Sequence, residues 1–366
     1  MAHDSPERHG GNREAWAQRL GCRPHQLLDA SASLVPFGPP PSLRRHWPRL
    51  GASAALTDYP DRAYTQLRQL LADHHGLDPA LVLPGNGAAE LFTWAARDAA
   101  ATGPSLLPTP GFADYRRALA CWEGPWQPLP LPLVWTTPFP SPFPAPTGAQ
   151  DTAAASVLWI TNPHNPTGQL WSRATLEPLL ARHPLVIVDE AFLPLTLEGE
   201  GQSLIPLVPH HPNLVVIRSL TKQFRVAGLR LGYALGDGHR LARWARWRDP
   251  WPVNGLAAAA AALLLADRRW PQRLHRWLAL EAPWLQQRLA RFPGLTPMPS
   301  ATNFLLLQGD RSLQPLRLAL AEQARVLVRD CRSFEGLGDR WLRLALLERS
   351  GHRRLLRALA RLWPCG

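Results

Sequence analysis

A single lysine stands out among the side chains that could do chemistry. Of the 40 lysine and arginine residues in this 366-residue chain, only Lys222 is a lysine. Arginine stays protonated in proteins, whereas a lysine amine that is shielded from water can lose its proton and attack a carbonyl carbon to form a Schiff base. Lys222 is therefore the candidate nucleophile. The alternative is that one lysine persists by chance at an exposed position.

The residues around Lys222 could hold a phosphate group. Lys222 follows the apolar run 214–217, and Ser219 and Thr221 place hydroxyl groups beside it. Arg230, further along the chain, can offer two parallel hydrogen bonds to an anion. A lysine, hydroxyl groups and an arginine together suit a ligand that carries both an aldehyde and a phosphate.

Backbone N–H groups for an anion are expected where a strand meets a helix. Residues 81–90 read Leu-Val-Leu-Pro-Gly-Asn-Gly-Ala-Ala-Glu, which predicts a strand, a glycine turn and the start of a helix. The free N–H groups of such a helix start bind anions. Alone, the same pattern is what an ordinary turn between a strand and a helix requires.

Two further polar clusters end apolar strands. Asp189 and Glu190 follow Val-Ile-Val, and residues 161–168 (Thr-Asn-Pro-His-Asn-Pro-Thr-Gly) follow Trp-Ile. A carboxylate beside a pyridine nitrogen keeps that nitrogen protonated, and an amide beside a phenolic oxygen stabilises its charge; pyridoxal 5′-phosphate (PLP) has both requirements. Taken singly, Asp189 could be a helix N-cap and Asn165 part of a type I turn. Together with the sole lysine, they favour the cofactor.

The elements that must carry these residues alternate between strands and helices. Between about residues 60 and 240, helical stretches such as 88–99 and 112–122 separate apolar runs of strand length. These runs are 81–83, 105–107, 157–161, 185–188, 214–218 and 229–234. The pattern predicts an α/β fold with a mainly parallel sheet, covered on both faces, that binds its ligand at the carboxyl ends of the strands. The proline-rich residues 124–146 predict a surface excursion.

Three regions are expected along the chain. A polar stretch with a short helix and a Pro/Gly-rich segment predicts an N-terminal arm over residues 1–40. The alternating pattern predicts a large domain over residues 41–245. Residues 246–366 are expected to form a smaller α/β domain. That domain opens with long helices and continues with predicted strands near 303–307, 326–329 and 341–345.

Composition and charge narrow the class of protein. Hydrophobic residues make up 46% of the chain and charged residues 19%, which excludes a disordered chain. Residues 1–239 carry 18 basic and 19 acidic side chains, whereas residues 240–366 carry 22 and 9. This excess could attract nucleic acid. Its arginines recur at helical spacings among Leu, Ala and Trp, however, which favours the solvated faces of amphipathic helices.

Targeting, membrane and metal signals are not evident in the sequence. The N-terminus lacks the apolar core of a signal peptide, and the longest apolar run, 256–266, is too short to cross a bilayer. The four cysteines show no C-x-x-C spacing, so they signal neither a zinc site nor a disulfide framework. We therefore expect a cytoplasmic protein with no metal, no membrane association and no nucleic-acid partner.

In order and spacing, three motifs resemble those of the fold type I, aspartate-aminotransferase-like PLP enzymes. They are 162–168 (Asn-Pro-His-Asn-Pro-Thr-Gly), 189–192 (Asp-Glu-Ala-Phe) and 219–233, which runs from Ser-Leu-Thr-Lys to Gly-Leu-Arg-Leu-Gly-Tyr. The resemblance covers nearly the whole chain. It implies a large domain with a mainly parallel seven-stranded sheet, a smaller C-terminal α/β domain, bound PLP and a homodimer.

The resemblance also implies roles for individual residues. Three would be catalytic: Lys222 as the Schiff-base amine, Asp189 at the pyridine nitrogen and Asn165 at the ring oxygen. The other residues expected to contact the cofactor are Gly87, Ala88, Ser219 and Arg230 at the phosphate, Phe112 stacked on the ring, and Tyr59, supplied by a partner subunit. The substrate α-carboxylate would bind Arg343, and we expect its phosphate to bind Arg329 and His9, with Arg332 a weaker candidate.

Two groups within this superfamily act on phosphorylated amines, and the chain resembles both. Decarboxylases of L-threonine O-3-phosphate, which make aminopropanol phosphate for cobalamin biosynthesis, are similar at 9–12, 110–115 and 328–334. Histidinol-phosphate aminotransferases usually carry a tyrosine where Phe192 stands, whereas phenylalanine also occurs in the decarboxylase pattern. Residues 29–36 depart from the family pattern, with serine and valine in place of asparagines. We expect decarboxylation of L-threonine O-3-phosphate, with a histidinol-phosphate-type aminotransferase activity as the alternative.

Overall fold

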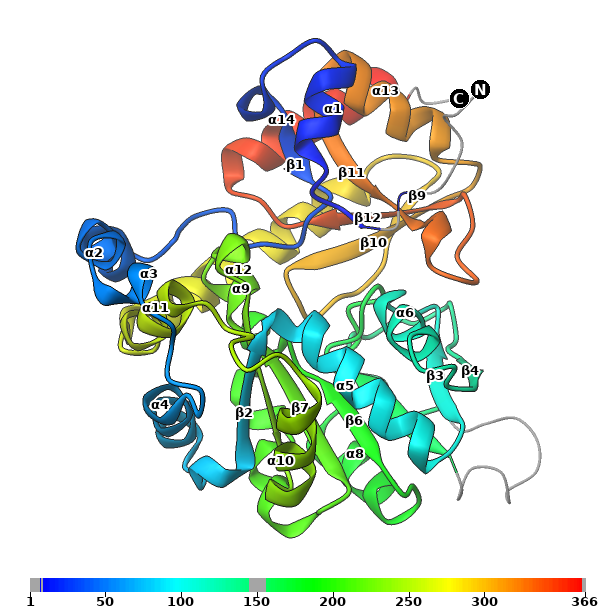
Figure 1. Ribbon diagram of the computed structural model, residues 1–366. Coiled ribbons are helices and arrows are strands. Elements are labelled where there is room, and N and C mark those ends of the chain that lie inside the picture. The colour runs from blue at the N-terminus through cyan, green and yellow to red at the C-terminus, as the bar shows by residue number, and fades with distance from the viewer. Residues whose placement is uncertain (1–6, 8, 145–155, 364–366) are drawn as a thin grey trace.

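Two β-sheets organise the part of the chain that the computed structural model describes, residues 7, 9–144 and 156–363 (Figure 1). The larger sheet has seven strands in the order β2-β8-β7-β6-β5-β3-β4. Its strands are β2 (Val82–Asn86), β3 (Ser105–Thr109), β4 (Trp126–Pro130), β5 (Val157–Thr161), β6 (Val186–Asp189), β7 (Leu214–Ser219) and β8 (Leu231–Gly236).

The directions of these strands confirm the predicted fold class. Strands β4, β3, β5, β6 and β7 pair in parallel, and β8 runs antiparallel to its neighbours β2 and β7. Strands β5, β6 and β7 are buried along their whole length. Such continuous burial is what a parallel sheet covered on both faces requires. The sheet is therefore mainly parallel and has the seven strands that the resemblance implies.

One strand lies where the sequence predicts a surface excursion. Strand β4 falls within residues 124–146 and pairs with β3 at the edge of the sheet. An edge strand tolerates Pro128 and Pro130 because its outer N–H groups have no partner strand. Leu129 is buried and fixes the strand to the core. The expectation of an excursion is therefore wrong for β4, and residues 145 and 146 lie outside the described part.

Helices flank both sheets, and the described α-helices vary from one turn to 21 residues. They are α1 (Arg13–Arg19), α2 (Pro41–Gly51), α3 (Ala54–Thr57), α4 (Thr65–His75), α5 (Gly87–Thr102), α6 (Asp114–Ala120), α8 (Arg173–Leu176), α9 (Leu220–Gln223), α10 (Gly238–Trp247), α11 (Gly255–Leu265), α12 (Arg269–Leu289), α13 (Gln314–Ala324) and α14 (Arg349–Leu362). Within the described residues, no helix combines the length and apolar character that crossing a bilayer requires.

Short 3₁₀ helices complete the connections between these elements. They are η1 (Pro24–Gln26), η2 (Pro79–Leu81), η3 (Glu177–Ala181), η4 (Leu193–Leu195), η5 (Gly199–Gln202), η6 (Ile205–His210), η7 (Ala227–Leu229) and η8 (Cys331–Ser333).

The two faces of the seven-stranded sheet bury alternate side chains. Trp159 and Ile187 face a core that includes α5, α6 and α10. Ile160 and Val188, the next residues along the same strands, join a second core with α4, α8, α11 and α12. This division follows from the two-residue period of a strand. Both faces are thus closed, and the strand ends are left to carry polar residues.

The smaller sheet lies above the larger one in Figure 1 and has the order β1-β11-β12-β10-β9. Its strands are β1 (Leu28–Ala30), β9 (Leu295–Pro297), β10 (Phe304–Gly309), β11 (Val326–Asp330) and β12 (Trp341–Ala345). The last three match the strands that the sequence predicts. Strand β1 comes from the stretch expected to form the arm and pairs in parallel with β11, Leu28 opposite Val326. The N-terminal stretch is thereby tied to the smaller sheet.

A buried carboxylate joins two helices on one face of the larger sheet. Asp98 on α5 accepts hydrogen bonds from Arg240, from Arg243 at 2.7 Å and from the Trp244 indole at 3.2 Å, all on α10. The Asp98 side chain is only 5% exposed. Removing one partner of a buried ion pair leaves the other partner uncompensated.

We predict that Asp98→Ala lowers the free energy of unfolding by about 3 kcal/mol, because it strands two guanidinium groups beside a buried position. Urea unfolding measures this change. The matched control is Glu322→Ala, which breaks an exposed pair with Arg19 and should cost less than about 1 kcal/mol. Equal losses in the two variants would show that the α5–α10 contact does not depend on this carboxylate.

Candidate active site

The predicted site residues meet where several strands of the larger sheet end. Strands β5 and β6 run in register, with Thr161 opposite Asp189, and β7 ends at Ser219, opposite Gly232 of β8. Strand β2 ends at Asn86 beside the start of β8. Because parallel strands present their carboxyl ends at one edge, residues far apart in the sequence are brought together.

Lys222 lies on the short helix α9, directly after β7. Ser219 caps this helix through an interaction of its Oγ with the N–H of Thr221, and the two hydroxyl groups are 2.7 Å apart. The Lys222 Nζ lies over the ring of Phe192, 4.6 Å from its centre. Loss of hydration lowers the pKa of the Lys222 amine; Arg230 and Arg343 act in the same direction, and Asp189 opposes them. The environment therefore favours the neutral, nucleophilic amine.

Asp189 is held by two hydrogen-bond donors. Its Oδ2 accepts from the Tyr115 hydroxyl at 2.7 Å, and its Oδ1 accepts from the Ala191 N–H at 2.9 Å. Thr161 Oγ1 lies 2.8 Å from the same Tyr115 oxygen. Burial raises the pKa of Asp189, whereas Lys222 and the two donors lower it. Tyr115 and Thr161 are functional candidates that the sequence analysis missed.

Asn165 links the two sheets. The buried Arg343, on β12, donates a hydrogen bond to Asn165 Oδ1 and a second, at 3.4 Å, to the backbone oxygen of Ser31. Its guanidinium group lies over the rings of Phe304 and Phe334. Burial lowers the pKa of Arg343, and its Nε is buried without a hydrogen-bond partner among the described residues. The structure thus brings the two predicted residues together and leaves a buried donor for an anion.

The residues expected at the cofactor phosphate form a second cluster. A Cβ at Gly87 would lie 2.5 Å from the Arg230 guanidinium, and a Cβ at Gly232 would lie 2.6 Å from the backbone nitrogen of Ala88. Gly232 is also the strand partner of Ser219. Glycine at both positions therefore lets the α5 start, the β7 end and Arg230 approach one another. Backbone N–H groups, a hydroxyl and a guanidinium are the groups that bind phosphate.

Aromatic and basic side chains from the N-terminal stretch and β11 lie next to this region. The ring of His9 packs edge-on against Phe112, with 6.0 Å between ring centres. Arg329 is the strand partner of Arg343 and donates to the Glu7 backbone oxygen and, at 2.7 Å, to Ser333 Oγ. Hence His9, Phe112, Arg329 and Arg343 stand near the predicted site.

Two other candidates lie apart from these clusters. Tyr59 is 78% exposed and stacks on Trp251, with 4.3 Å between ring centres. Arg332 forms an ion pair with Asp330 at 2.9 Å, so its charge is balanced within its own turn.

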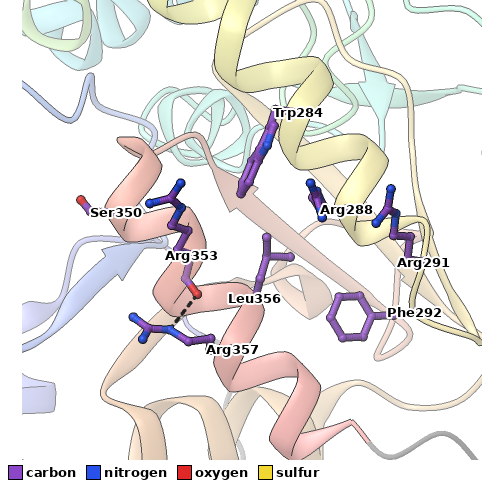
Figure 2. Close-up of a pocket in the computed structure, with 8 residues that line it drawn as sticks. All are labelled: Trp284, Arg288, Arg291, Phe292, Ser350, Arg353, Leu356 and Arg357. Atoms are coloured by element: carbon purple, nitrogen blue, oxygen red, sulfur yellow. Dashed lines mark hydrogen bonds between the residues drawn. The ribbon is translucent and has the colours of Figure 1, made fainter.

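A separate hollow of about 820 Å³ lies between α12 and α14 (Figure 2). It is lined by four arginines, by Ser350 and by three apolar side chains: Arg288, Arg291, Arg353 and Arg357, then Trp284, Phe292 and Leu356. None of the predicted site residues lines it. The hollow brings together part of the C-terminal arginine excess, and no carboxylate of the described residues lines it.

These residues fit PLP. Ser219, Arg230 and the N–H groups at the start of α5 would hold its phosphate, and by the family resemblance Phe112 would stack on its ring. Asp189 has lone pairs left for a pyridine N–H, because a carboxylate accepts about four hydrogen bonds and the structure shows two. Lys222 would bond the aldehyde carbon.

The fold and the site together define a fold type I PLP-dependent enzyme. The chain belongs to the family described as aminotransferase class I and II, whose model matches residues 26–359. It is 36% identical to the threonine-phosphate decarboxylase of Salmonella typhimurium, over 96% of this chain and 95% of that relative. It is 33% identical to the histidinol-phosphate aminotransferase of Symbiobacterium thermophilum, over 92% and 90%.

A solved structure shows the same fold with the cofactor. The histidinol-phosphate aminotransferase from Sinorhizobium meliloti in complex with pyridoxal-5′-phosphate has a TM-score of 0.81 and 21% identity, and the match covers 98% of this chain and 95% of that one. The predicted family, fold class and cofactor are therefore confirmed. The roles of individual residues stay predictions.

We predict that Lys222→Arg abolishes the visible absorbance of PLP bound as a Schiff base, because a guanidinium group does not form this bond. Turnover should fall by several orders of magnitude, as for other removed nucleophiles. Absorbance spectra and borohydride reduction followed by peptide mapping measure the Schiff base, and product formation measures turnover. As a control, Arg361→Lys adds a lysine at an exposed position, and the label must remain on Lys222 alone. Label at position 361, or colour in Lys222→Arg, would contradict the assignment.

Proposed function

We propose that this protein decarboxylates L-threonine O-3-phosphate to aminopropanol phosphate and CO₂, a reaction that serves cobalamin biosynthesis. The observation that carries the proposal is the pair of buried arginines on adjacent strands, Arg343 and Arg329, which are 6% and 3% exposed. Guanidinium groups bind carboxylates and phosphates through paired hydrogen bonds. Two such groups on neighbouring strands therefore suit a substrate that carries both a carboxylate and a phosphate.

The contacts of the two arginines suggest which anionic group of the substrate each of them binds. Arg343 donates to Asn165, which by family resemblance lies at the cofactor ring, so a carboxylate on Arg343 would stand close to the ring. Arg329 lies one strand further out, beside the N-terminal stretch that carries His9. We assign the substrate phosphate to Arg329 and His9. The distance along the substrate between its two anionic groups would match the separation of two neighbouring strands.

Orientation of the substrate decides between the two candidate reactions. When bound, PLP accepts the electron pair of whichever Cα bond stands perpendicular to its ring. If Arg343 holds the carboxylate out of the ring plane, CO₂ would leave. The Lys222 amine, having taken up the proton that the substrate ammonium gives up on bonding the aldehyde, would then return that proton to Cα. The apolar Phe192 beneath this amine helps to keep water away.

An aminotransferase that acts on histidinol phosphate or a similar amine is the second candidate. The 33% identity to a relative of that name supports it. In that reaction the α-proton, and not the carboxylate, would leave toward Lys222. The relative named as a decarboxylase has the higher identity and coverage, which favours the first proposal.

We predict that the PLP-loaded protein releases CO₂ from L-threonine O-3-phosphate without any 2-oxo acid acceptor. Carbon-dioxide release and product mass are measured with and without 2-oxoglutarate. Strict dependence on the acceptor, or conversion of PLP to pyridoxamine phosphate by histidinol phosphate, would overturn decarboxylation in favour of the second candidate.

A substitution of Arg329 tests the assignment of the substrate phosphate. Arg329→Gln should raise the KM for L-threonine O-3-phosphate about 10- to 100-fold, the range for losing a hydrogen bond to a charged group. Arg332→Gln is the matched control: it removes a nearby arginine, on η8, whose guanidinium forms an ion pair with Asp330. An unchanged KM in Arg329→Gln would remove Arg329 from the substrate site.

We further propose that the protein acts as a cytoplasmic homodimer in which Tyr59 reaches the cofactor phosphate of the partner. The exposure of Tyr59 supports this arrangement. Each active site would then combine Lys222 of one subunit with Tyr59 of the other.

We predict that a mixture of Lys222→Ala and Tyr59→Ala subunits regains activity after joint refolding, because each heterodimer contains one site in which both residues are intact. Turnover is measured against each variant refolded alone. Failure of mixed subunits to regain activity, in dimers verified by mass, would place Tyr59 in its own subunit's site or outside any site.

A further inference from the structure

We propose that Tyr115 is a positioning residue for the cofactor. Its hydroxyl orients Asp189 and keeps this carboxylate charged, so that the pyridine nitrogen of PLP stays protonated. The inference rests on the confirmed PLP dependence of the family and holds for either of the two candidate reactions. It also extends to Thr161, which supports Tyr115 from the neighbouring strand.

Hydrogen-bond directions at this site follow from the donors available. Asp189 accepts at Oδ2 from Tyr115, so the single phenolic proton points toward the carboxylate. The Thr161 hydroxyl, 2.8 Å from the Tyr115 oxygen, must then be the donor in that second contact. A short chain of donors therefore runs from Thr161 through Tyr115 to Asp189, and its negative end lies at Asp189.

Tyr115 has little freedom to leave this position. It is 2% exposed, and its ring packs against Phe92 and Phe112 edge-on, at 5.1 and 5.6 Å, and against Trp159 at 5.2 Å. Edge-to-face packing of this kind stabilises a specific ring orientation. The hydroxyl is therefore preorganised, and it does not need to be ordered when the cofactor binds.

The carboxylate needs such a donor because it is buried. Burial raises the pKa of Asp189 and so favours its neutral form, which could not hold a pyridine nitrogen protonated. The other titratable groups that act on Asp189 are Lys222, which lowers its pKa, and Asp114, which raises it. A bond to the cofactor aldehyde would remove the free Lys222 ammonium, so Tyr115 and the Ala191 N–H become the lasting support.

One helix thereby serves two sides of the cofactor. Phe112, which the family resemblance assigns to stacking on the ring, lies just before α6, and Tyr115 is the second residue of that helix. The two aromatic rings contact each other. Placement of the stacking ring and orientation of the carboxylate are thus set by the same few residues.

The test uses the PLP-loaded protein without substrate, so its result is independent of the reaction catalysed. Tyr115→Phe keeps the ring and removes the hydroxyl. We expect the dissociation constant of PLP to rise about 10-fold, as for loss of a hydrogen bond to a charged group. With ¹⁵N-labelled PLP, the pyridine nitrogen signal at neutral pH should move toward the neutral-pyridine position, because the proton shifts toward a more basic Asp189.

A double-mutant comparison separates positioning from packing. In the Asp189→Asn background, Tyr115→Phe should change neither the nitrogen signal nor PLP affinity, because the group through which Tyr115 acts is gone. Tyr64→Phe is the matched control: Tyr64 is also buried, but its hydroxyl bonds the backbone of Val253. This variant should leave the nitrogen signal unchanged.

Two outcomes would overturn the proposal. One is an unchanged nitrogen signal in a folded Tyr115→Phe protein. The other is the same loss of affinity with and without Asp189, which would indicate packing alone. If Tyr115→Phe fails to fold, Thr161→Val decides, since it should move the nitrogen signal in the same direction by a smaller amount; no movement would then refute the donor chain.

Discussion

The active site depends on one contact between the two sheets, the hydrogen bond from Arg343 of β12 to Asn165 at the end of β5. Neither residue could form a site alone. The larger sheet carries the amine, the carboxylate and the turn to which we assign the cofactor phosphate, and the smaller sheet carries the guanidinium groups to which we assign the substrate. Because Arg343 also donates to the Ser31 backbone, the N-terminal stretch is held at the same point, and three separate parts of the chain meet there.

Burial shifts the pKa values of the titratable groups at this site. In surroundings poor in water, loss of hydration favours neutral amines and neutral carboxylic acids. The pKa of Lys222 is lowered and that of Asp189 is raised by this cause. The lowered pKa of Lys222 suits its proposed role as a nucleophile. At Asp189, the hydrogen-bond donors Tyr115 and Ala191 offset the effect of burial on the pKa. Burial therefore favours the proposed role of Lys222 and opposes that of Asp189.

Much of this could be predicted from the sequence, and the rest could not for definite reasons. Lys222 could be predicted because it is the only lysine in the chain. Asp189 and Asn165 could be predicted because they are polar residues that follow apolar runs of strand length. Tyr115 carried no such signal, because its partner Asp189 lies 74 residues away and tyrosine is common in cores. Strand β1 was not predicted because its three residues are too few to show the two-residue period of a strand. Strand β4 was not predicted because it contains Pro128 and Pro130, and proline is unusual in strands.

The central claim is that the two arginines hold the substrate so that its carboxylate stands out of the plane of the cofactor ring. The direct measurement is a crystal structure of the Lys222→Ala variant with PLP and L-threonine O-3-phosphate bound. The account predicts the carboxylate on Arg343, perpendicular to the ring, and the phosphate on Arg329. A carboxylate in the ring plane, with the α-hydrogen perpendicular instead, would contradict it.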